Sequence, residues 1–391
     1  MKGISLIYII IVLFSAGSAF YGLLHILRQL RVSWRLTLSL ALLLALLSGG
    51  HQFLLSYGNY HDLSVIHPLL YLTAFAANFG IFALPLALVI DIMLSILRLA
   101  KGPILTRPPL IYLRKIYGAC ALIFISICSV VALIFAQALP QFDRQDIYIA
   151  NLHPDLEGLT IAQVSDVHTS PFFTAARSES IVQELMQAKP DLIVFTGDQV
   201  DGNPSQRGKD MLPFTKLQAP LGVYYIAGNH EYITGMGEWQ RWYQAHGLNL
   251  LINAHARAQV GSAQLSIVGL DDAQALRAGE RGFNGPNIEQ ALTGLADDDF
   301  RLLLAHQPRG TQQYADPRFG IDLMLSGHTH GGQVPLLNVL TGAANQGLLA
   351  GLYHLGKMQL YVSEGAGLWQ GFCARLGTQS QINLFTLKRA H

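Results

Sequence analysis

The chain has 391 residues, of which 51% are hydrophobic and 13% are charged, and its mean hydropathy is +0.33. This composition is too apolar for an ordinary soluble protein of this length. The formal net charge of +1, without basic runs, gives no sign of a nucleic-acid surface, and three cysteines are too few for a disulfide framework or a thiolate metal site.

Apolar residues concentrate in four segments before about residue 140. Each segment is predominantly apolar for about 20 residues or more, the length that an α-helix needs to cross ~30 Å of hydrocarbon. The predicted transmembrane helices cover residues 4–24, 35–55, 69–97 and 116–138. The sequence therefore predicts a membrane region over residues 1–139, a linker with an entry strand near residues 147–150 over residues 140–158, and a further domain over residues 159–391.

The distribution of Lys and Arg predicts the orientation of these helices. The loops after the first and third segments carry eight basic residues: Arg28, Arg31, Arg35, Arg98, Lys101, Arg107, Arg114 and Lys115. The opposite side carries Lys2, Arg144 and residues 56–68, which contain no Lys or Arg. Because basic loops stay in the cytoplasm, we expect a multi-pass inner-membrane protein whose part after residue 140 is periplasmic.

One alternative reverses this orientation. Lys2, the apolar run from Ile4 and the small residues at 15–19 also resemble a secretory signal with a cleavage site. Cleavage there would leave three spans and return the later domain to the cytoplasm, against the charge bias. Asp91 is an acid well inside a predicted span, and we expect it to be interfacial or locally paired.

Five short apolar runs after residue 158 each stop at a polar residue. They cover residues 159–165, 192–196, 223–227, 301–305 and 321–326. Their length, and their bounding by Gly, Asp, Asn or His, are typical of buried strands. Helical stretches such as residues 176–189 and 238–246 alternate with them, which predicts an α/β domain with helices outside a largely buried sheet. Chemistry in such domains gathers beyond the carboxyl ends of the strands.

The residues at these strand ends have oxygen or imidazole ligand atoms and no sulfur. They are Asp166, His168, Asp198, Asn229, His306, His328 and His330. This set suits borderline divalent metals such as Mn, Fe, Zn or Ni better than a calcium site or a thiolate zinc site. Seven ligands are too many for one catalytic ion, whereas two ions ~3.5–4 Å apart need a shared ligand, for which a carboxylate is suited.

In this order and spacing the motifs resemble the calcineurin-like metallophosphoesterase family over about residues 146–387. The motifs are Asp166-Val167-His168, Gly197-Asp198, Gly228-Asn229-His230-Glu231, His306 and Gly327-His328-Thr329-His330. The four apolar segments further resemble the transmembrane branch of that family, and Gly331-Gly332-Gln333 resembles its bacterial membrane-associated phosphodiesterase relatives. The resemblance implies a β-sandwich flanked by helices.

The resemblance also implies roles for these residues. One metal ion would be held by Asp166, His168, Asp198 and His330, and a second by Asp198, Asn229, His306 and His328. A hydroxide bridging both ions would attack phosphorus, and His230 would stabilise the transition state and protonate the leaving alcohol. Asp201 and Glu231 are candidates for supporting these residues. Glu364 stands where many relatives carry arginine, which would discourage strongly anionic substrates unless its side chain turns away.

The predicted function is a membrane-anchored phosphoesterase acting on phosphodiesters or lipid-linked phosphates, with the lipid bilayer as a partner and no nucleic acid. A phosphodiesterase without lipid preference is one alternative. A UDP-diacylglucosamine-type lipid A precursor is another substrate, but relatives that cleave such precursors work on the cytoplasmic side, against the predicted orientation. A metal- or phosphate-binding signalling module without turnover is the third, although such a module should have lost ligands and this sequence has lost none.

Overall fold

The computed structural model describes residues 6–58, 67–101 and 108–390. Contacts between Cα atoms divide the chain into two compact units. The first comprises residues 1–136 together with 371–376, and the second comprises residues 137–370 together with 377–391. Each unit is described by itself below.

Within the described residues, the first unit has four helices that are long and apolar enough to cross a membrane. They are α1 (Leu6–Gln29), α2 (Trp34–Gly58), α3 (His67–Lys101) and α4 (Pro108–Gln137). Each predicted span falls on one of these helices, and residues 4 and 5 of the first lie outside the described part of the chain. The prediction of four apolar helices is confirmed. The helices run further than the hydropathy pattern at several ends, because a helical backbone can continue through polar residues beyond the apolar stretch.

Small residues allow the first three helices to approach closely. A Cβ atom on Gly80 of α3 would lie 2.7 Å from the backbone nitrogen of Ala19 on α1, and one on Gly22 would overlap Ala83. The hydroxyl oxygens of Ser15 and Ser48 are 2.7 Å apart. Small residues at helix interfaces are typical of membrane bundles, where packing and hydrogen bonds replace the hydrophobic effect. The small residues that resemble a cleavage site therefore have a packing role in α1.

Asp91 has local partners on a neighbouring helix. Its Oδ1 atom lies 3.0 Å from Nδ1 of His25, and Tyr21 donates a hydrogen bond to its Oδ2 atom at 2.5 Å. The Nε2 atom of His25 is in turn 3.2 Å from the hydroxyl of Tyr117 on α4. This network gives the Asp91 carboxylate polar partners within an apolar bundle, as expected for a locally paired carboxylate.

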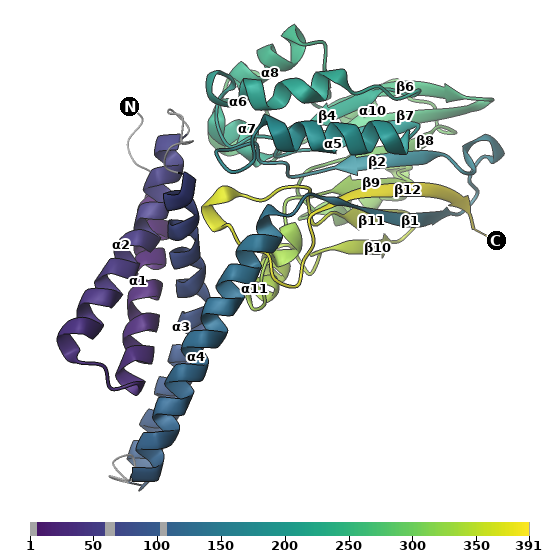
Figure 1. Ribbon diagram of the computed structural model, residues 1–391. Coiled ribbons are helices and arrows are strands. Elements are labelled where there is room, and N and C mark those ends of the chain that lie inside the picture. Colours follow the sequence, from purple (N-terminus) through teal and green to yellow (C-terminus); the bar gives the residue numbers. More distant parts are fainter. Residues whose placement is uncertain (1–5, 59–66, 102–107, 391) are drawn as a thin grey trace. The chain divides into compact units, whose positions relative to one another are not determined.

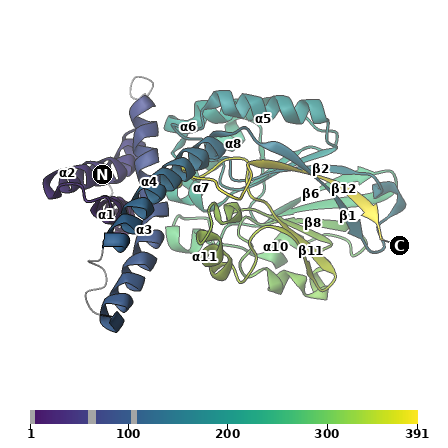
Figure 2. The same cartoon turned by 60° about the horizontal axis from the view of Figure 1, so that its bottom comes forward.

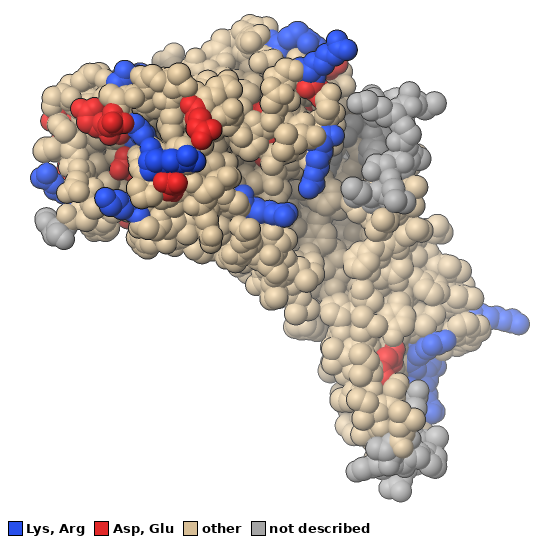
Figure 3. All heavy atoms as spheres, turned by 180° about the vertical axis from the view of Figure 1, so that it is seen from behind, with Lys and Arg blue, Asp and Glu red and all other residues tan. Residues whose placement is uncertain are grey.

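The C-terminal end of α1 and the N-terminal part of α4 lie side by side in this helical unit. Arg114, near the start of α4, donates from Nε to the Gln29 side chain at the end of α1, at 2.7 Å. On the face shown in Figure 3, the helical unit is uncharged over most of its length, with Lys and Arg gathered toward one end. Lys2, Arg107 and residues 59–66 of the opposite loop lie outside the described residues.

A short segment from late in the sequence also belongs to the first unit. Residues 371–376 contain the carbonyl of Cys373, which accepts a hydrogen bond from the Asn78 side chain at 2.8 Å. The amide of Arg375 donates to the carbonyl of Ala132 at 3.0 Å. These partners are far apart along the chain, so the local sequence pattern did not predict their pairing.

The second unit is built on two six-stranded sheets. The first has the order β1 (Gln141–Ile149), β12 (Gln381–Arg389), β2 (Thr160–Val164), β3 (Leu192–Thr196), β4 (Val223–Ile226) and β5 (Asn249–Leu250). The second has the order β10 (Gly351–Leu355), β11 (Met358–Val362), β9 (Leu323–Ser326), β8 (Phe300–Leu304), β7 (Ala263–Gly269) and β6 (Ala254–Val260). Strands β2 to β5 are parallel, as are β7, β8, β9 and β11.

The two sheets pack face to face around one apolar core. Buried residues of both sheets form it, among them Ile161 and Val194 of the first sheet and Leu302 and Leu325 of the second. Figures 1 and 2 show helices on the outer faces. The helices of this unit are α5 (Ala175–Ala188), α6 (Pro204–Met211), α7 (Asn229–Thr234), α8 (Met236–Ala245), α9 (Ala275–Ala278), α10 (Ile288–Leu292) and α11 (Leu337–Ala344). The predicted β-sandwich flanked by helices is confirmed.

The sequence predicted one sheet more completely than the other. All five apolar runs form strands, because both faces of these strands are covered and most of their residues are apolar. Strands β5, β6, β7, β10 and β12 were not predicted. In β6 and β10 the residues are half-buried or exposed and include polar side chains, so they form no apolar run. The predicted entry strand near residues 147–150 is the end of a longer strand, β1, which pairs in parallel with β12.

Arg177 of α5 joins the start of the second unit to its C-terminal part. Its guanidinium donates to the carbonyls of Gln137, Ala138 and Ala366, at 2.7 to 3.0 Å, and to the hydroxyl of Ser380.

Removing the Arg177 guanidinium leaves several buried acceptors unpaired. We expect Arg177→Met to lower the free energy of unfolding by about 3 kcal/mol. Urea unfolding followed by tryptophan fluorescence measures this, and exposed Arg281→Met is the control. Equal midpoints for both variants would contradict the expectation.

Candidate metal centre

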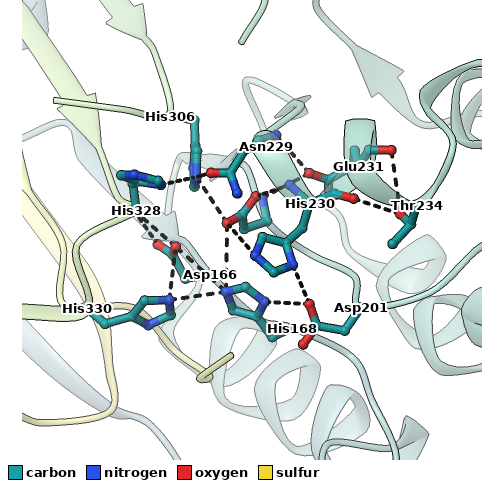
Figure 4. Close-up of polar contacts among 12 residues, drawn as sticks. Asp166, His168, Asp201, Asn229, His230, Glu231, Thr234, His306, His328 and His330 are labelled. Atoms are coloured by element: carbon teal, nitrogen blue, oxygen red, sulfur yellow. Dashed lines mark hydrogen bonds and ion pairs between the residues drawn. The ribbon is translucent and has the colours of Figure 1, made fainter. Parts of the chain in front are cut away.

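The seven predicted ligand residues all come from the carboxyl ends of five parallel strands. Asp166 and His168 follow β2, Asp198 follows β3 and Asn229 begins α7 just after β4. The second sheet supplies His306 after β8, and His328 and His330 after β9. Figure 4 shows that the six labelled ligand side chains, those other than Asp198, point toward one another. The sandwich thus brings both sheets' strand ends to one site.

Within this cluster the ligand atoms form groups that could hold a metal ion. Two groups are Asp166, His168 and His330, and Asp198, His306 and His328, and the ligand atoms of each group lie within 4.8 Å of one another. Asp198 lies between them. Its Oδ2 atom is 3.1 Å from Nε2 of His306 and 3.8 Å from Nε2 of His168. One carboxylate therefore faces imidazoles of both groups.

The hydrogen bonds of two histidines direct a free nitrogen into the cluster. Nδ1 of His306 lies 2.8 Å from the carbonyl of Thr196, which can only accept, so Nδ1 carries the proton. Nδ1 of His168 lies 2.9 Å from Oδ1 of Asp201. In both rings Nε2 is therefore the nitrogen that faces the other ligand atoms and can give a lone pair to a metal ion. This arrangement, with one nitrogen held by a carbonyl or carboxylate, is typical of metal-bound histidine.

The short distances between imidazole nitrogens in this cluster are also consistent with a cation bound among them. Nε2 of His168 is 3.1 Å from Nε2 of His330, and Nδ1 of His328 is 3.2 Å from Nε2 of His306. Burial lowers the pKa of His306, but adjacent Asp198 outweighs burial and raises it well above its ordinary value. The carboxylates thus create a negative potential that positive charge relieves. The donor set and its electrostatics fit divalent metal ions.

Asn229 and Asp166 complete the cluster from opposite sides. The side-chain oxygen of Asn229 lies 3.2 Å from Nε2 of His306. The carboxylate of Asp166 is fully buried and accepts hydrogen bonds from the backbone amide of His328 at 3.0 Å and from the hydroxyl of Ser165 at 2.6 Å. These bonds fix the carboxylate between two strand ends. Ser165 was not among the predicted residues, because a serine at a strand end has no distinctive pattern.

His230 lies at the edge of the cluster and is held by Asp201. Its Nδ1 atom is 2.6 Å from Oδ1 of Asp201, and its Nε2 atom is 4.0 Å from Oδ2 of Asp198. Burial lowers the pKa of His230, but the two carboxylates outweigh it and raise the pKa to about 9. Asp201 therefore contacts both His168 and His230 through one carboxylate oxygen, which orients the two rings together.

Glu231 holds the backbone beneath the imidazoles. Its carboxylate accepts from the amides of Gly228 at 2.7 Å, Gln199 at 2.7 Å and Asp198 at 3.1 Å. Burial, followed by the charge of Asp198, raises the pKa of Glu231 to about 7. This side chain therefore joins the turn after β3 to the turn after β4.

Five of the ligand residues adopt a left-handed backbone conformation. Their φ angles are 53° for Asp166, 49° for His168, 55° for Asp198, 74° for His328 and 50° for His330. Asp, Asn and His tolerate this region better than most residues, but it still costs free energy and persists only where the surrounding structure holds it. Strain of this kind gathers at functional sites.

Glycines next to the ligands are required by close packing. A Cβ atom on Gly327 would overlap the Ser165 hydroxyl and the Asp166 carboxylate.

We expect Gly327→Ala to displace Asp166 and lower phosphoesterase activity and metal content. The loss in rate should be about 10²-fold, since small misplacements at a reacting site have effects of this size. Gly342→Ala is the control, because its Cβ atom would meet open space. Metal analysis and rate together check this, and an unchanged rate would contradict it.

A pocket of about 230 Å³ opens onto the cluster. Besides Asp198, His230, His328 and other cluster residues, it is lined by Trp369, Leu337 and Thr341, which the sequence did not predict. The Trp369 ring lies 6.4 Å from that of His230. Glu364 is not among the described lining residues, and its carboxylate accepts the amide of Gln379 at 2.7 Å. The side chain that would have discouraged anionic substrates is thus bonded outside the pocket.

Comparison with known proteins identifies the family. The family model described as calcineurin-like phosphoesterase matches residues 159–332. A "Transmembrane protein with metallophosphoesterase domain" of Danio rerio is 32% identical over 275 residues, which are 69% of this chain and 62% of the relative. The protein of the same name in Bos taurus is 31% identical over 282 residues, 70% of this chain and 62% of the relative.

A third relative is shorter. The "Uncharacterized metallophosphoesterase YkuE" of Bacillus subtilis is 32% identical over 240 residues, which are 59% of this chain and 80% of that protein. The chain spans about 62% of the length of the two transmembrane relatives. The matched segment contains all seven predicted ligand residues and the strands that position them. This chain belongs to the calcineurin-like phosphoesterase family.

Proposed function

We propose that this protein is a membrane-anchored phosphoesterase that uses two divalent metal ions to hydrolyse phosphodiesters or lipid-linked phosphates. The observation that carries the proposal is the position of Asp198 between two groups of ligand atoms, with His306 on one side and His168 on the other. A carboxylate with an oxygen for each of two ions is the shared ligand that a two-metal site needs.

The ligands divide between the two ions by their positions. Asp166, His168 and His330 would hold one ion, Asn229, His306 and His328 the other, and Asp198 both. The ligand atoms favour Mn, Fe, Zn or Ni. When bound, such ions lower the pKa of water and neutralise charge on phosphoryl oxygens. The protein's own contribution is to fix the ligand atoms, through the carbonyl of Thr196 on His306 and the carboxylate of Asp201 on His168.

His230 is the proposed proton donor to the leaving group. It lines the pocket beside the ligands, and Asp201 holds its Nδ1 atom at 2.6 Å, which leaves Nε2 directed toward Asp198. An imidazole held in this way can stabilise charge on the departing oxygen and give it a proton. Trp369 next to this ring would limit the access of water to it.

The proposed location of the catalytic domain is the extracytoplasmic side of the inner membrane. The basic residues that flank the first and third loops support this, and the contact between Arg114 of α4 and Gln29 of α1 joins the helix ends next to those loops. Basic loops at one end mark the cytoplasmic side. The α4 helix ends at Gln137 and β1 starts at Gln141, so the domain begins directly after the last span.

Hydrolysis of bis-p-nitrophenyl phosphate and p-nitrophenyl phosphate tests the proposal. The full chain is purified in detergent, stripped of metal with a chelator and supplied again with Mn, Fe, Zn, Ni or Mg. We expect turnover to disappear with the metal and to return with at least one borderline metal, with two ions bound per chain. A folded chain that binds two ions yet hydrolyses neither compound would contradict this function and favour a binding module.

A further inference from the structure

The helix α11 is an apolar element beside the metal pocket. It follows the last ligand motif closely, and residues 331–353 contain no Asp, Glu, Lys, Arg or His. None of its residues is buried. The side chains of Leu336, Val339 and Leu340 are 62%, 68% and 66% exposed. Single exposed apolar residues are common, but Val339 and Leu340 on one short uncharged helix, together with Leu336 directly before it, form a patch that needs a partner.

The two faces of α11 have different surroundings. Leu337 and Thr341, four residues apart, lie on one face and line the pocket with the cluster residues and Trp369. Leu340 and then Val339 lie further round the helix from this face, and Leu336 directly precedes the first helical residue with a non-helical backbone. An apolar surface therefore continues from the wall of the metal pocket to the outside of the domain.

The turn before α11 fixes the helix in this position. A Cβ atom on Gly332 would overlap the backbone of Asn338, so the turn after His330 packs against the first residues of the helix. Gln333 and Leu336 have φ angles of 63° and 75°, which reverse the chain direction within a few residues. The patch thus lies on an ordered element at a set distance from the ligands.

The chain itself indicates what covers this patch. A soluble phosphoester would leave the apolar side chains in water, whereas a lipid has both a phosphate for the pocket and a hydrocarbon chain for the helix. Four helices of the same chain are long and apolar enough to cross a membrane, and only residues 138–140 separate α4 from β1. A bilayer therefore presents lipid phosphates to this domain at high local concentration.

We infer that α11 binds the hydrocarbon chain of a lipid-linked phosphoester substrate, with Leu336, Val339 and Leu340 as the residues that select it. The inference rests on the proposed function, narrows its substrate class to phosphoesters that carry a hydrocarbon chain, and names the element that binds that chain. The phosphate binds at the metal pocket, and the hydrocarbon chain lies along α11. Each buried CH₂ group contributes favourable transfer free energy, so a long chain should raise kcat/KM strongly.

Two chromogenic diesters test the inference: methyl p-nitrophenyl phosphate and decyl p-nitrophenyl phosphate. Both release p-nitrophenol, so the same bond is broken and only the length of the hydrocarbon chain differs. The full chain is assayed in detergent at one fixed mole fraction of substrate. We expect kcat/KM for the decyl compound to exceed that for the methyl compound by roughly tenfold or more, mainly through KM.

The double variant Val339→Gln and Leu340→Gln should remove most of this preference. Neither side chain lines the pocket, so the rate with the methyl compound should change by no more than about twofold, which also shows that the variant is folded. The control is Leu276→Gln, which replaces a leucine that is 69% exposed on α9 and does not line the pocket. It should leave the preference unchanged.

The outcomes separate this inference from the proposed function. Equal kcat/KM for both compounds in the parent protein, or a preference that the double variant retains, would overturn the role of α11 while leaving phosphoesterase activity intact. If the parent hydrolyses neither compound, the proposed function fails. The helix is then tested by binding of decyl phosphate to the metal-loaded chain, measured by calorimetry. Binding as tight in the double variant as in the parent would overturn the inference.

Discussion

Replacement of Asp198 by alanine should abolish turnover. Asp198 is buried and faces His306 and His168 at 3.1 and 3.8 Å, so its loss removes a ligand from both proposed ion sites and leaves the imidazoles without their shared carboxylate. Because charge stabilisation by metal ions amounts to several kcal/mol, we expect kcat/KM for bis-p-nitrophenyl phosphate to fall by at least about 10³-fold. Metal content should fall from two ions per chain to one or none.

Two matched variants control for this result. Asp298→Ala removes an exposed carboxylate and should leave both rate and metal content unchanged. Asp198→Asn keeps the size of the side chain, and its rate separates loss of charge from loss of packing. If Asp198→Ala kept two bound ions and full activity, the assignment of a shared ligand would be wrong.

His230→Gln should spare the metal ions and slow the reaction. If His230 protonates the leaving group, the loss depends on how much the leaving group needs a proton. For an alkyl leaving group we expect kcat to fall by about 10²–10⁴-fold, the usual contribution of general acid catalysis. For p-nitrophenol, whose anion is a weak base, the loss should be much smaller. The measurement is kcat for both types of diester, with metal content determined on the same samples.

The result also decides between two roles for His230. The ring lies close enough to His168 and Asp198 to be a ligand, since these three also form a group that could hold a metal ion. Loss of a bound ion from His230→Gln, with the same fall in rate for both leaving groups, would make it a ligand instead of an acid. His246→Gln is the control, because that histidine is exposed and stacks on Trp242 outside the site.

The sequence alone determined the elements with strong local signals. The membrane helices were predictable because hydrocarbon thickness demands a long apolar run, which few other structures contain. Strands β2, β3, β4, β8 and β9 were predictable because burial on both faces makes them short apolar runs with polar ends. The types of ligand at those ends indicated oxygen and nitrogen chemistry without any knowledge of the fold.

The partners within the site required the tertiary structure. The sequence placed Asp166 and His330 at strand ends, but only the packing of two sheets brings these residues of different sheets together. The sequence indicated Asp201 and Glu231 only as candidates for supporting the ligands. The structure shows Asp201 bonded to two histidines and Glu231 to three backbone amides. A carboxylate's partner depends on distance in space, which spacing along the chain does not give.

Other features had no local signal at all. Trp369 lies in the pocket because a late loop returns to the site, and the carbonyl of Cys373 meets Asn78 across 295 residues of sequence. From the sequence alone, the apolar residues of α11 are as compatible with a buried position as with an exposed one. Only the fold leaves them exposed. Local pattern fixes which residues are apolar and how they repeat, whereas long-range packing decides which of them are covered and which side chains meet.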